Sequence, residues 1–192
     1  MADLARQLQR TGRRPFVIPM GGSTAIGARG YVVCADEIRE QVQALGARLT
    51  DVAVASSSGG TQSGLAVGFA ADPVRVHGIS VDEPQDVLTE LVRTISAPCA
   101  EALDRPAPRE ITVHTDWIGP GYALPSEDMV EAVRLFARFE GILLDPVYSG
   151  KGAAGFLALA RAGAFEGHAV FVHTGGSPAL FAYPRPAVPY PA

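Results

Sequence analysis

The feature that most constrains the fold is an alternation of short apolar runs with longer segments of helical period. Runs rich in valine and isoleucine lie at residues 16–18, 52–55, 74–81, 111–113 and 169–172. Segments of helical period lie between them, at residues 26–45, from 60 onward, 87–103, 126–140 and 150–162. Strands that are apolar along their whole length, each followed by a helix, are typical of a parallel sheet covered on both faces. We therefore predict a three-layer α/β fold, with helices on both faces of a mainly parallel sheet.

The composition excludes several classes of partner. The chain has 192 residues, 47% hydrophobic and 19% charged, so it can bury a sizeable core. Lysine and arginine total 16 against 20 acidic residues, and the arginines are scattered, so no nucleic-acid partner is expected. No run reaches the about 18 apolar residues that a membrane span requires, and the first residues have the spacing of an amphipathic helix. With Cys34 and Cys99 too far apart for a CxxC pair, we predict a cytoplasmic protein with no membrane partner.

A loop rich in serine and glycine follows the apolar run at 52–55 and occupies residues 56–64. Glycines let a backbone approach an anion closely, hydroxyls add donors, and a following helix offers free N–H groups at its positive end. The loop lacks the Gly-Lys-Ser/Thr ending of nucleotide-binding loops and the GxGxxG spacing of dinucleotide folds. We interpret it as a phosphate cradle; the alternative is a turn that only caps a helix.

Three further turns carry small or polar residues. The turn at 21–27 is interpreted as a helix entry, with Ser23 or Thr24 as the cap. The turn at 145–152 places an aromatic ring, a hydroxyl and a cation at a helix start, and residues 172–176 close the last apolar run. Since ligands of parallel sheets bind beyond the carboxyl ends of the strands, these turns predict a site for a small ligand with a phosphate and a polar ring.

The histidines do not predict a metal site. They show no metal-ligand spacing, and each lies at or within an expected strand: His77, His114, His168 and His173. We interpret them as structural residues, and no metal is expected.

Five motifs, in order along the chain, resemble one family. They are Ile-Pro-Met-Gly-Gly-Ser at 18–23, Ser-Gly-Gly-Thr at 58–61, Gly-Pro-Gly-Tyr at 119–122, Leu-Asp-Pro-Val-Tyr-Ser-Gly-Lys at 144–151 and His-Thr-Gly-Gly at 173–176. The set is similar to the pyridoxal-phosphate enzymes that comprise D-cysteine desulfhydrase and 1-aminocyclopropane-1-carboxylate deaminase. The resemblance implies a fold like that of the tryptophan synthase β class, with pyridoxal 5'-phosphate between two domains, a small amino-acid substrate and a homodimer in the full-length form.

The resemblance also assigns site residues. Tyr148 matches a tyrosine at the substrate side of the cofactor, used in binding and proton handling. The cofactor-binding positions that it implies are Ser58, Gly59, Gly60 and Thr61 for the phosphate, with Gln62 assisting, and Ser149, Thr174 and Gly175 elsewhere around the cofactor.

Two of these positions distinguish the branches of the family. The cyclopropane deaminases resemble one another in having a glutamate where this chain has Ser149 and a leucine where it has Thr174. A carboxylate keeps the ring nitrogen protonated and makes the cofactor a strong electron sink, whereas a hydroxyl does not enforce protonation. The weaker sink suffices for β-elimination of hydrosulfide, so the resemblance favours the desulfhydrase branch. Deaminase activity is the alternative within the family.

The chain differs from the family that it resembles in lacking a counterpart of the lysine that binds the cofactor. The Schiff-base lysine of the family lies in a segment before the first residue of this chain, and Lys151 is the only lysine present. Lys151 matches a family lysine that does not carry the cofactor, and a lysine at a helix start is expected to reach solvent or a nearby carboxylate such as Asp145. Without a covalent anchor, the isolated chain is expected to be inactive or nearly so.

The predicted organisation is therefore a carboxyl-terminal portion of an enzyme. Residues 1–182 are expected to hold the large cofactor domain with a remnant of the small domain, and residues 183–192 a proline-rich tail. A hydrophobic face left uncovered would make the isolated chain self-associate. The alternative is a non-catalytic remnant that binds phosphate or pyridoxal phosphate weakly, or a structural partner of a separately encoded front half.

Overall fold

The sheet of this protein is parallel throughout. The computed structural model describes residues 1–183, so the predicted tail lies outside the described residues except for Tyr183. Within them the strands are β1 (Leu49–Ser56), β2 (Arg75–Ser80), β3 (Thr112–His114) and β4 (His168–Val172), in the order β3-β2-β1-β4. Every pair is parallel, which confirms the prediction of a mainly parallel sheet.

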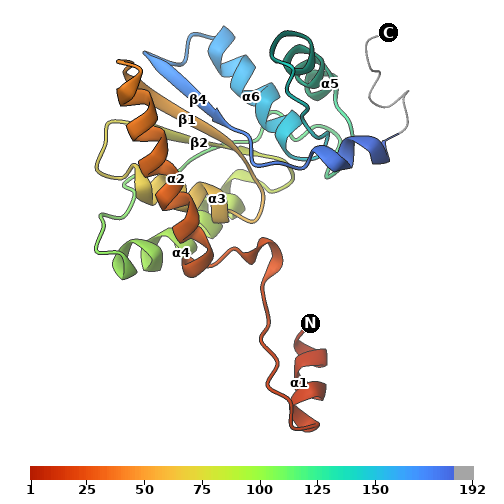
Figure 1. Cartoon of the computed structure of the whole chain (residues 1–192). Coiled ribbons are helices and arrows are strands. Elements are labelled where there is room, and N and C mark those ends of the chain that lie inside the picture. The colour runs from red at the N-terminus through yellow and green to blue at the C-terminus, as the bar shows by residue number, and fades with distance from the viewer. Residues whose placement is uncertain (184–192) are drawn as a thin grey trace.

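Helices cover both faces of the sheet, as predicted (Figure 1). One layer consists of α2 (Ala25–Ala44), α3 (Gly60–Gly68) and α4 (Gln85–Ala102), and the other of α5 (Glu127–Leu135) and α6 (Ser149–Arg161). Alternate side chains of β1 face the two layers, because successive residues of a strand point to opposite faces. Val54 belongs to the buried cluster with Leu65 of α3, whereas Ala55 lies against Gly152 of α6.

The helix ends follow local sequence signals. Thr24 accepts a hydrogen bond from the Gly27 N–H and caps α2, and Ser126 caps α5 through the Met129 N–H. The predicted helix at 126–140 is present, but its last residues, Phe136–Glu140, form a π-helical turn that ends at Gly141 in the left-handed conformation. A 3-10 helix, Ser177–Ala182, follows β4.

The first residues stand apart from the body of the molecule (Figure 1). The helix α1 (Ala2–Arg10) has no buried residue, and an extended segment joins it to the 3-10 turn Met20–Gly22. The prediction of a strand at 16–18 is wrong: this segment is irregular and Phe16 is 88% exposed. No strand within residues 1–183 pairs with this segment, and Pro15 and Pro19 on either side of it cannot donate backbone hydrogen bonds.

A polar cluster is buried beneath the α6 side of the sheet. Asp51 is fully buried and accepts hydrogen bonds from Thr50, His77 and Arg75. The second ring nitrogen of His77 lies 3.0 Å from His114. Burial alone would raise the pKa of the Asp51 carboxyl, but these hydrogen bonds outweigh it and hold the pKa below its ordinary value. These two histidines therefore have structural partners. In residues 1–183 no helix is both long and apolar enough to cross a membrane.

The layer of α2 and α3 depends on glycines at their contact. A Cβ added at Gly64 would lie 2.2 Å from the carbonyl oxygen of Ala28 and 2.6 Å from Cβ of Tyr31. Such distances leave no room for a side chain, because interiors are close-packed and backbone atoms cannot move aside cheaply. The close approach of α2 fixes where its first turn meets the loop after β1.

We predict that Gly64→Ala lowers the free energy of unfolding by about 1–3 kcal/mol, the usual cost of overpacking. The matched control is Gly30→Ala in α2, where an added Cβ meets nothing within 4 Å. Because alanine favours the helix interior, that control should raise the free energy of unfolding by roughly 0.5–1 kcal/mol. Urea denaturation followed by circular dichroism measures both. Equal effects of the two substitutions would contradict the packing argument.

Candidate functional site

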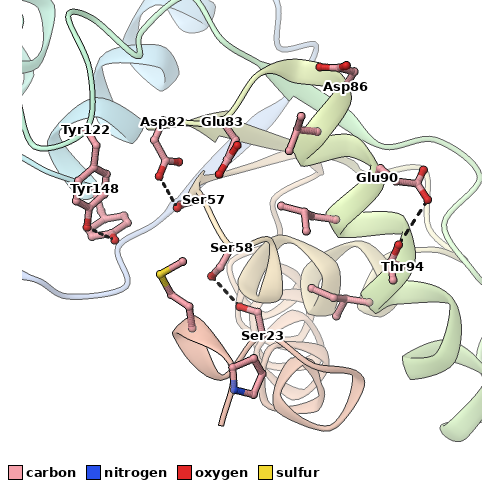
Figure 2. Close-up of a pocket in the computed structure, with 15 residues that line it drawn as sticks. Ser23, Ser57, Ser58, Asp82, Glu83, Asp86, Glu90, Thr94, Tyr122 and Tyr148 are labelled. Carbon is pink, nitrogen blue, oxygen red and sulfur yellow. Dashed lines mark hydrogen bonds between the residues drawn. The ribbon is translucent and has the colours of Figure 1, made fainter. Parts of the chain in front are cut away.

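A cavity of about 1110 Å³ lies at the carboxyl ends of β1 and β2 (Figure 2). The loop after β1 forms its floor, α4 one wall, and two tyrosines the opposite wall. Its position agrees with the expectation that parallel sheets bind ligands beyond the carboxyl ends of their strands. The polar residues that line it are Ser23, Ser57, Ser58, Asp82, Glu83, Asp86, Glu90, Thr94, Tyr122 and Tyr148.

The serine–glycine loop turns directly into α3. Gly59 precedes the helix with a φ of 78°, a left-handed conformation that glycine adopts without strain. The first N–H groups of a helix have no acceptor within the helix, so those of Gly60 and Thr61 are available to a ligand. Ser58 lines the cavity and Gly60 and Thr61 are half-buried behind it. The loop is thus built as an anion cradle at the positive end of a helix.

The turn at 21–27 belongs to the same site. Thr24 is its helix cap, which settles the choice between Ser23 and Thr24. The Ser23 hydroxyl instead donates to the Ser58 hydroxyl at 2.7 Å (Figure 2). A Cβ added at Gly21 would lie 2.5 Å from Oγ of Ser58, and one at Gly60 would lie 2.7 Å from Oγ of Ser23. Glycines therefore allow the two loops to touch, and the first loop supports the cradle.

The side chain of Gln62 does not point into the cavity. It is 1% exposed, and its amide nitrogen donates to the carbonyl oxygen of Thr112 at 2.9 Å. A Cβ at Gly78 would overlap its amide group, so this side chain lies flat on β2. Only the backbone N–H of Gln62 can take part in anion binding; the side chain joins α3 to β3.

Two tyrosines form the wall opposite α4. The hydroxyls of Tyr122 and Tyr148 lie 2.5 Å apart, and the rings meet edge to face (Figure 2). Burial, followed by the hydrogen bond with Tyr122, raises the pKa of the Tyr148 phenol above its ordinary value. Tyr148 therefore keeps its proton at neutral pH and can donate it at this side of the cavity.

A buried carboxylate positions Tyr148. Asp145 is fully buried and accepts hydrogen bonds from the N–H groups of Val147, Tyr148 and Ser149, all between 2.7 and 2.8 Å. Its negative charge lies at the start of α6, where the helix dipole favours an anion. A Cβ at Gly176 would lie 2.7 Å from the Asp145 carboxylate, so the loop after β4 also requires glycine here. The Asp145 turn fixes both the helix start and the tyrosine wall.

The other predicted cofactor positions do not line the cavity. The Ser149 hydroxyl is buried and donates to the Asp145 carboxylate at 2.5 Å. Thr174 is exposed on the loop after β4, and Gly175 has a φ of 103° in the same loop. Of the predicted site residues, Ser58 and Tyr148 line the cavity in the described part of the chain. Gly59, Gly60 and Thr61 follow Ser58 directly in the sequence.

Lys151 reaches neither solvent nor Asp145, so that expectation is wrong. Its side chain is fully buried, and Nζ donates to the carbonyl oxygens of Val81, Ile118 and Gly121 at 3.3, 2.6 and 2.6 Å. Burial lowers the pKa of its ammonium below the ordinary value. The small residues around the start of α6 let this helix approach β1 closely enough to place the side chain between two loops.

Sequence reasoning missed three residues of the site. Ser23 and Tyr122 lie within recognised motifs, but Ser23 was considered only as a helix cap and Tyr122 was not assigned to the site. Asp82 follows β2 and accepts a hydrogen bond from the Ser57 hydroxyl at 3.0 Å, while its other oxygen is buried without a partner in the described part of the chain. Its place directly after an apolar run was the available signal, because the loops after neighbouring parallel strands meet at one edge.

The residues present fit a phosphate-bearing aromatic ligand. The cradle offers backbone and hydroxyl donors, and its glycines keep the loop close to its neighbours, since an added Cβ at Gly60 would lie 2.7 Å from Oγ of Ser23 and one at Gly59 would lie 3.3 Å from Val92. The remaining volume lies between this cradle and the tyrosine wall. A ligand bound there by its phosphate would extend toward the tyrosine hydroxyls.

Comparisons with known proteins agree with this geometry. The sequence pattern of the family described as "Pyridoxal-phosphate dependent enzyme" matches residues 1–175. The chain is 44% identical over 189 residues to a D-cysteine desulfhydrase of Serratia proteamaculans (strain 568), covering 95% of this chain and 57% of that relative. It is 43% identical over 185 residues to a D-cysteine desulfhydrase of Klebsiella pneumoniae (strain 342), covering 94% and 56%. The chain spans little more than half the length of these curated relatives.

A solved structure has the same fold. The crystal structure of a homologue of 1-aminocyclopropane-1-carboxylate (ACC) deaminase superposes with a TM-score of 0.84 at 34% sequence identity, covering 91% of this chain and 53% of that one. The layered parallel fold and the family resemblance predicted from the motifs are thereby confirmed. The chain belongs to the family of pyridoxal-phosphate dependent enzymes.

Proposed function

We propose that this chain supplies the phosphate-binding and tyrosine-bearing part of a pyridoxal-phosphate lyase that converts D-cysteine to pyruvate, hydrogen sulfide and ammonia. The proposal rests on one arrangement: the serine–glycine loop at the start of α3 and the hydrogen-bonded tyrosine pair line the same cavity. The proposed substrate and reaction are those named for the D-cysteine desulfhydrases. Their similarity to this chain extends over 95% and 94% of the chain's own length.

Each residue has a task that its position supports. The Ser58 hydroxyl and the N–H groups of Gly60 and Thr61 bind the phosphate, with Ser23 holding Ser58 in place. Bound pyridoxal phosphate supplies an electron sink that makes the α-proton of an amino acid easier to remove. Tyr148, paired with Tyr122, holds a proton at its hydroxyl on the substrate side of the cavity.

Ser149 supports the desulfhydrase branch over the deaminase branch. Ser149 carries a hydroxyl at the position where the deaminases carry a carboxylate. In this chain the Ser149 hydroxyl donates a hydrogen bond to the Asp145 carboxylate. A site without that carboxylate is suited to releasing a good leaving group such as hydrosulfide. Thr174 and Gly175 complete the proposed cofactor surroundings in the loop after β4.

The covalent anchor of the cofactor must come from a segment other than these 192 residues. Lys151 is the only lysine, and all its donors are directed at backbone carbonyls. The chain alone is therefore proposed to bind the cofactor without turnover. We further propose that residues 1–182 form the cofactor domain with part of a small domain, in a cytoplasmic homodimer.

The proposal is tested by joining this chain to the part of a relative that the chain does not cover. We expect that fusing the uncovered portion of the Serratia proteamaculans D-cysteine desulfhydrase ahead of Met1 gives a protein that releases sulfide and pyruvate from D-cysteine. Tyr148→Phe in the fusion should reduce kcat by about 10²-fold or more, in the range of lost general acid–base catalysis. Sulfide trapping with a pyruvate-coupled assay measures both products.

The fusion also separates the alternatives. Thr89→Ser, on α4 outside the cavity, is the control and should leave the rate unchanged. Release of ammonia and 2-oxobutanoate from 1-aminocyclopropane-1-carboxylate, with no sulfide from D-cysteine, would replace the proposal with the deaminase reaction. A folded fusion that binds the cofactor but turns over neither substrate would indicate a non-catalytic remnant.

A second prediction concerns cofactor binding by the chain alone. Ser58→Asp should weaken pyridoxal phosphate binding at least about tenfold, equivalent to about 1.4 kcal/mol, because a carboxylate in the cradle repels the phosphate. Thr89→Asp adds the same charge outside the cavity and should change the affinity by less than about twofold. Equilibrium dialysis gives the affinities. Borohydride reduction and peptide mapping should leave Lys151 unmodified; labelling of Lys151 would show that the chain carries its own anchor.

A further inference from the structure

The ammonium of Lys151 joins three parts of the chain that lie far apart in the sequence. It lies on the first turn of α6, and its three carbonyl partners are Val81, in the loop after β2, and Ile118 and Gly121, in the loop between β3 and α5. A lysine ammonium has three donors and no acceptor, so three carbonyl oxygens satisfy it completely. A neutral amine would leave one of them without a donor in a buried place.

Each of these segments carries a group of the cavity wall. Val81 precedes Asp82, Gly121 precedes Tyr122, and Tyr148 lies just before α6, three residues from Lys151 itself. The ammonium thus lies behind the wall, bonded to the residues that precede Asp82 and Tyr122 and one helical turn from Tyr148. It faces the backbone, not the ligand space, and is not among the residues that line the cavity.

The loop that carries Tyr122 needs external support. Ala123 has a φ of 57°, a left-handed conformation that is uncommon for a residue with a side chain, whereas Gly121, with a φ of 152°, adopts a conformation that suits glycine. A strained residue such as Ala123 persists only where surrounding contacts fix it. Two contacts do so on either side of Tyr122: Lys151 binds the Gly121 carbonyl, and the Tyr183 hydroxyl donates to the Ala123 carbonyl at 2.6 Å.

We propose that Lys151 is a positioning residue. Its buried ammonium holds the loop between β3 and α5 against α6, so that the Tyr122 hydroxyl stays hydrogen-bonded to the Tyr148 hydroxyl. Charge-assisted hydrogen bonds are stronger than neutral ones, and here two of them are 2.6 Å long. The catalytic use of the tyrosine pair rests on the proposed function; the positioning by Lys151 does not, and its test needs neither cofactor nor substrate.

The first test uses the single lysine of the chain. In protein labelled with 15N-lysine, one side-chain resonance is expected. At pH 7 it should be that of an ammonium whose protons exchange at least about tenfold more slowly than those of free lysine, because its donors are buried and bonded. A neutral amine, or an ammonium that exchanges as fast as free lysine, would overturn the proposal without any substitution.

The second test measures the tyrosine pair in variants. With 3-fluorotyrosine incorporated, 19F NMR follows the ionisation of Tyr148, its resonance being assigned with Tyr148→Phe. Lys151→Met keeps the apolar stem and removes the ammonium. We expect this variant to lower the pH midpoint of Tyr148 ionisation by about one pH unit, because an open loop exposes the phenol and removes its Tyr122 partner. Losing a nearby positive charge without loop opening would move the midpoint upward.

Two further variants separate positioning from general destabilisation. Leu157→Ala removes packing from α6 at a residue that touches the buried cluster of α5, and it should leave the Tyr148 midpoint unchanged. Tyr183→Phe removes the other support of the loop. If Tyr183→Phe lowers the midpoint and Lys151→Met does not, the loop is held by Tyr183 and the proposal is wrong. Failure of the sulfide assay with these NMR results intact would reject the proposed function alone.

Discussion

The parallel pairing of β1 with β2 and β4 is the constraint from which the site follows. All four strands run in one direction, so the loops that leave their carboxyl ends meet at one edge of the sheet. Ser56 pairs with Ser80, which sets the next residues of both strands side by side and brings the Ser57 hydroxyl to the Asp82 carboxylate. A shift of one residue in this register would turn Ser57 to the other face of the sheet.

Small residues then determine how closely the helical layers approach that edge. Added Cβ atoms at Gly152 and Gly155 would lie 2.9 Å from Ala55 and 2.7 Å from Ile79, so α6 lies almost on the strands. A helix so close to the sheet can place a long side chain between the loops beyond β2 and β3, which is where the Lys151 ammonium lies. On the other face, Gly64 allows α2 a similarly close approach to α3, and Ser23, just before the cap of α2, meets Ser58 of the loop after β1.

The sequence predicts those features that depend on neighbours along the chain. Apolar runs and helical periods predicted the layers, and the glycines at 59 and 60 predicted the tight turn into α3, because each is a local requirement of the backbone. The segment at 16–18 was misjudged since a strand needs a partner, which composition does not reveal. The side-chain contacts of Gln62 and the burial of Lys151 could not be predicted for a related reason: the partners are backbone carbonyls at Thr112, Ile118 and Gly121, and the residue types at those positions give no sign of such contacts.

The charges around the cavity give a bound anion one orientation. The positive end of α3 lies at the floor, whereas carboxylates line the cavity after β2, at Asp82 and Glu83, and on α4, at Asp86 and Glu90 (Figure 2). A phosphate is attracted by the free N–H groups and the helix dipole at the start of α3 and is repelled by the carboxylates. The positive amino group of an amino acid has the reverse preference. A ligand that carries both a phosphate and a cationic group is therefore oriented by this cavity, with its phosphate at the start of α3 and its cationic group toward the carboxylates.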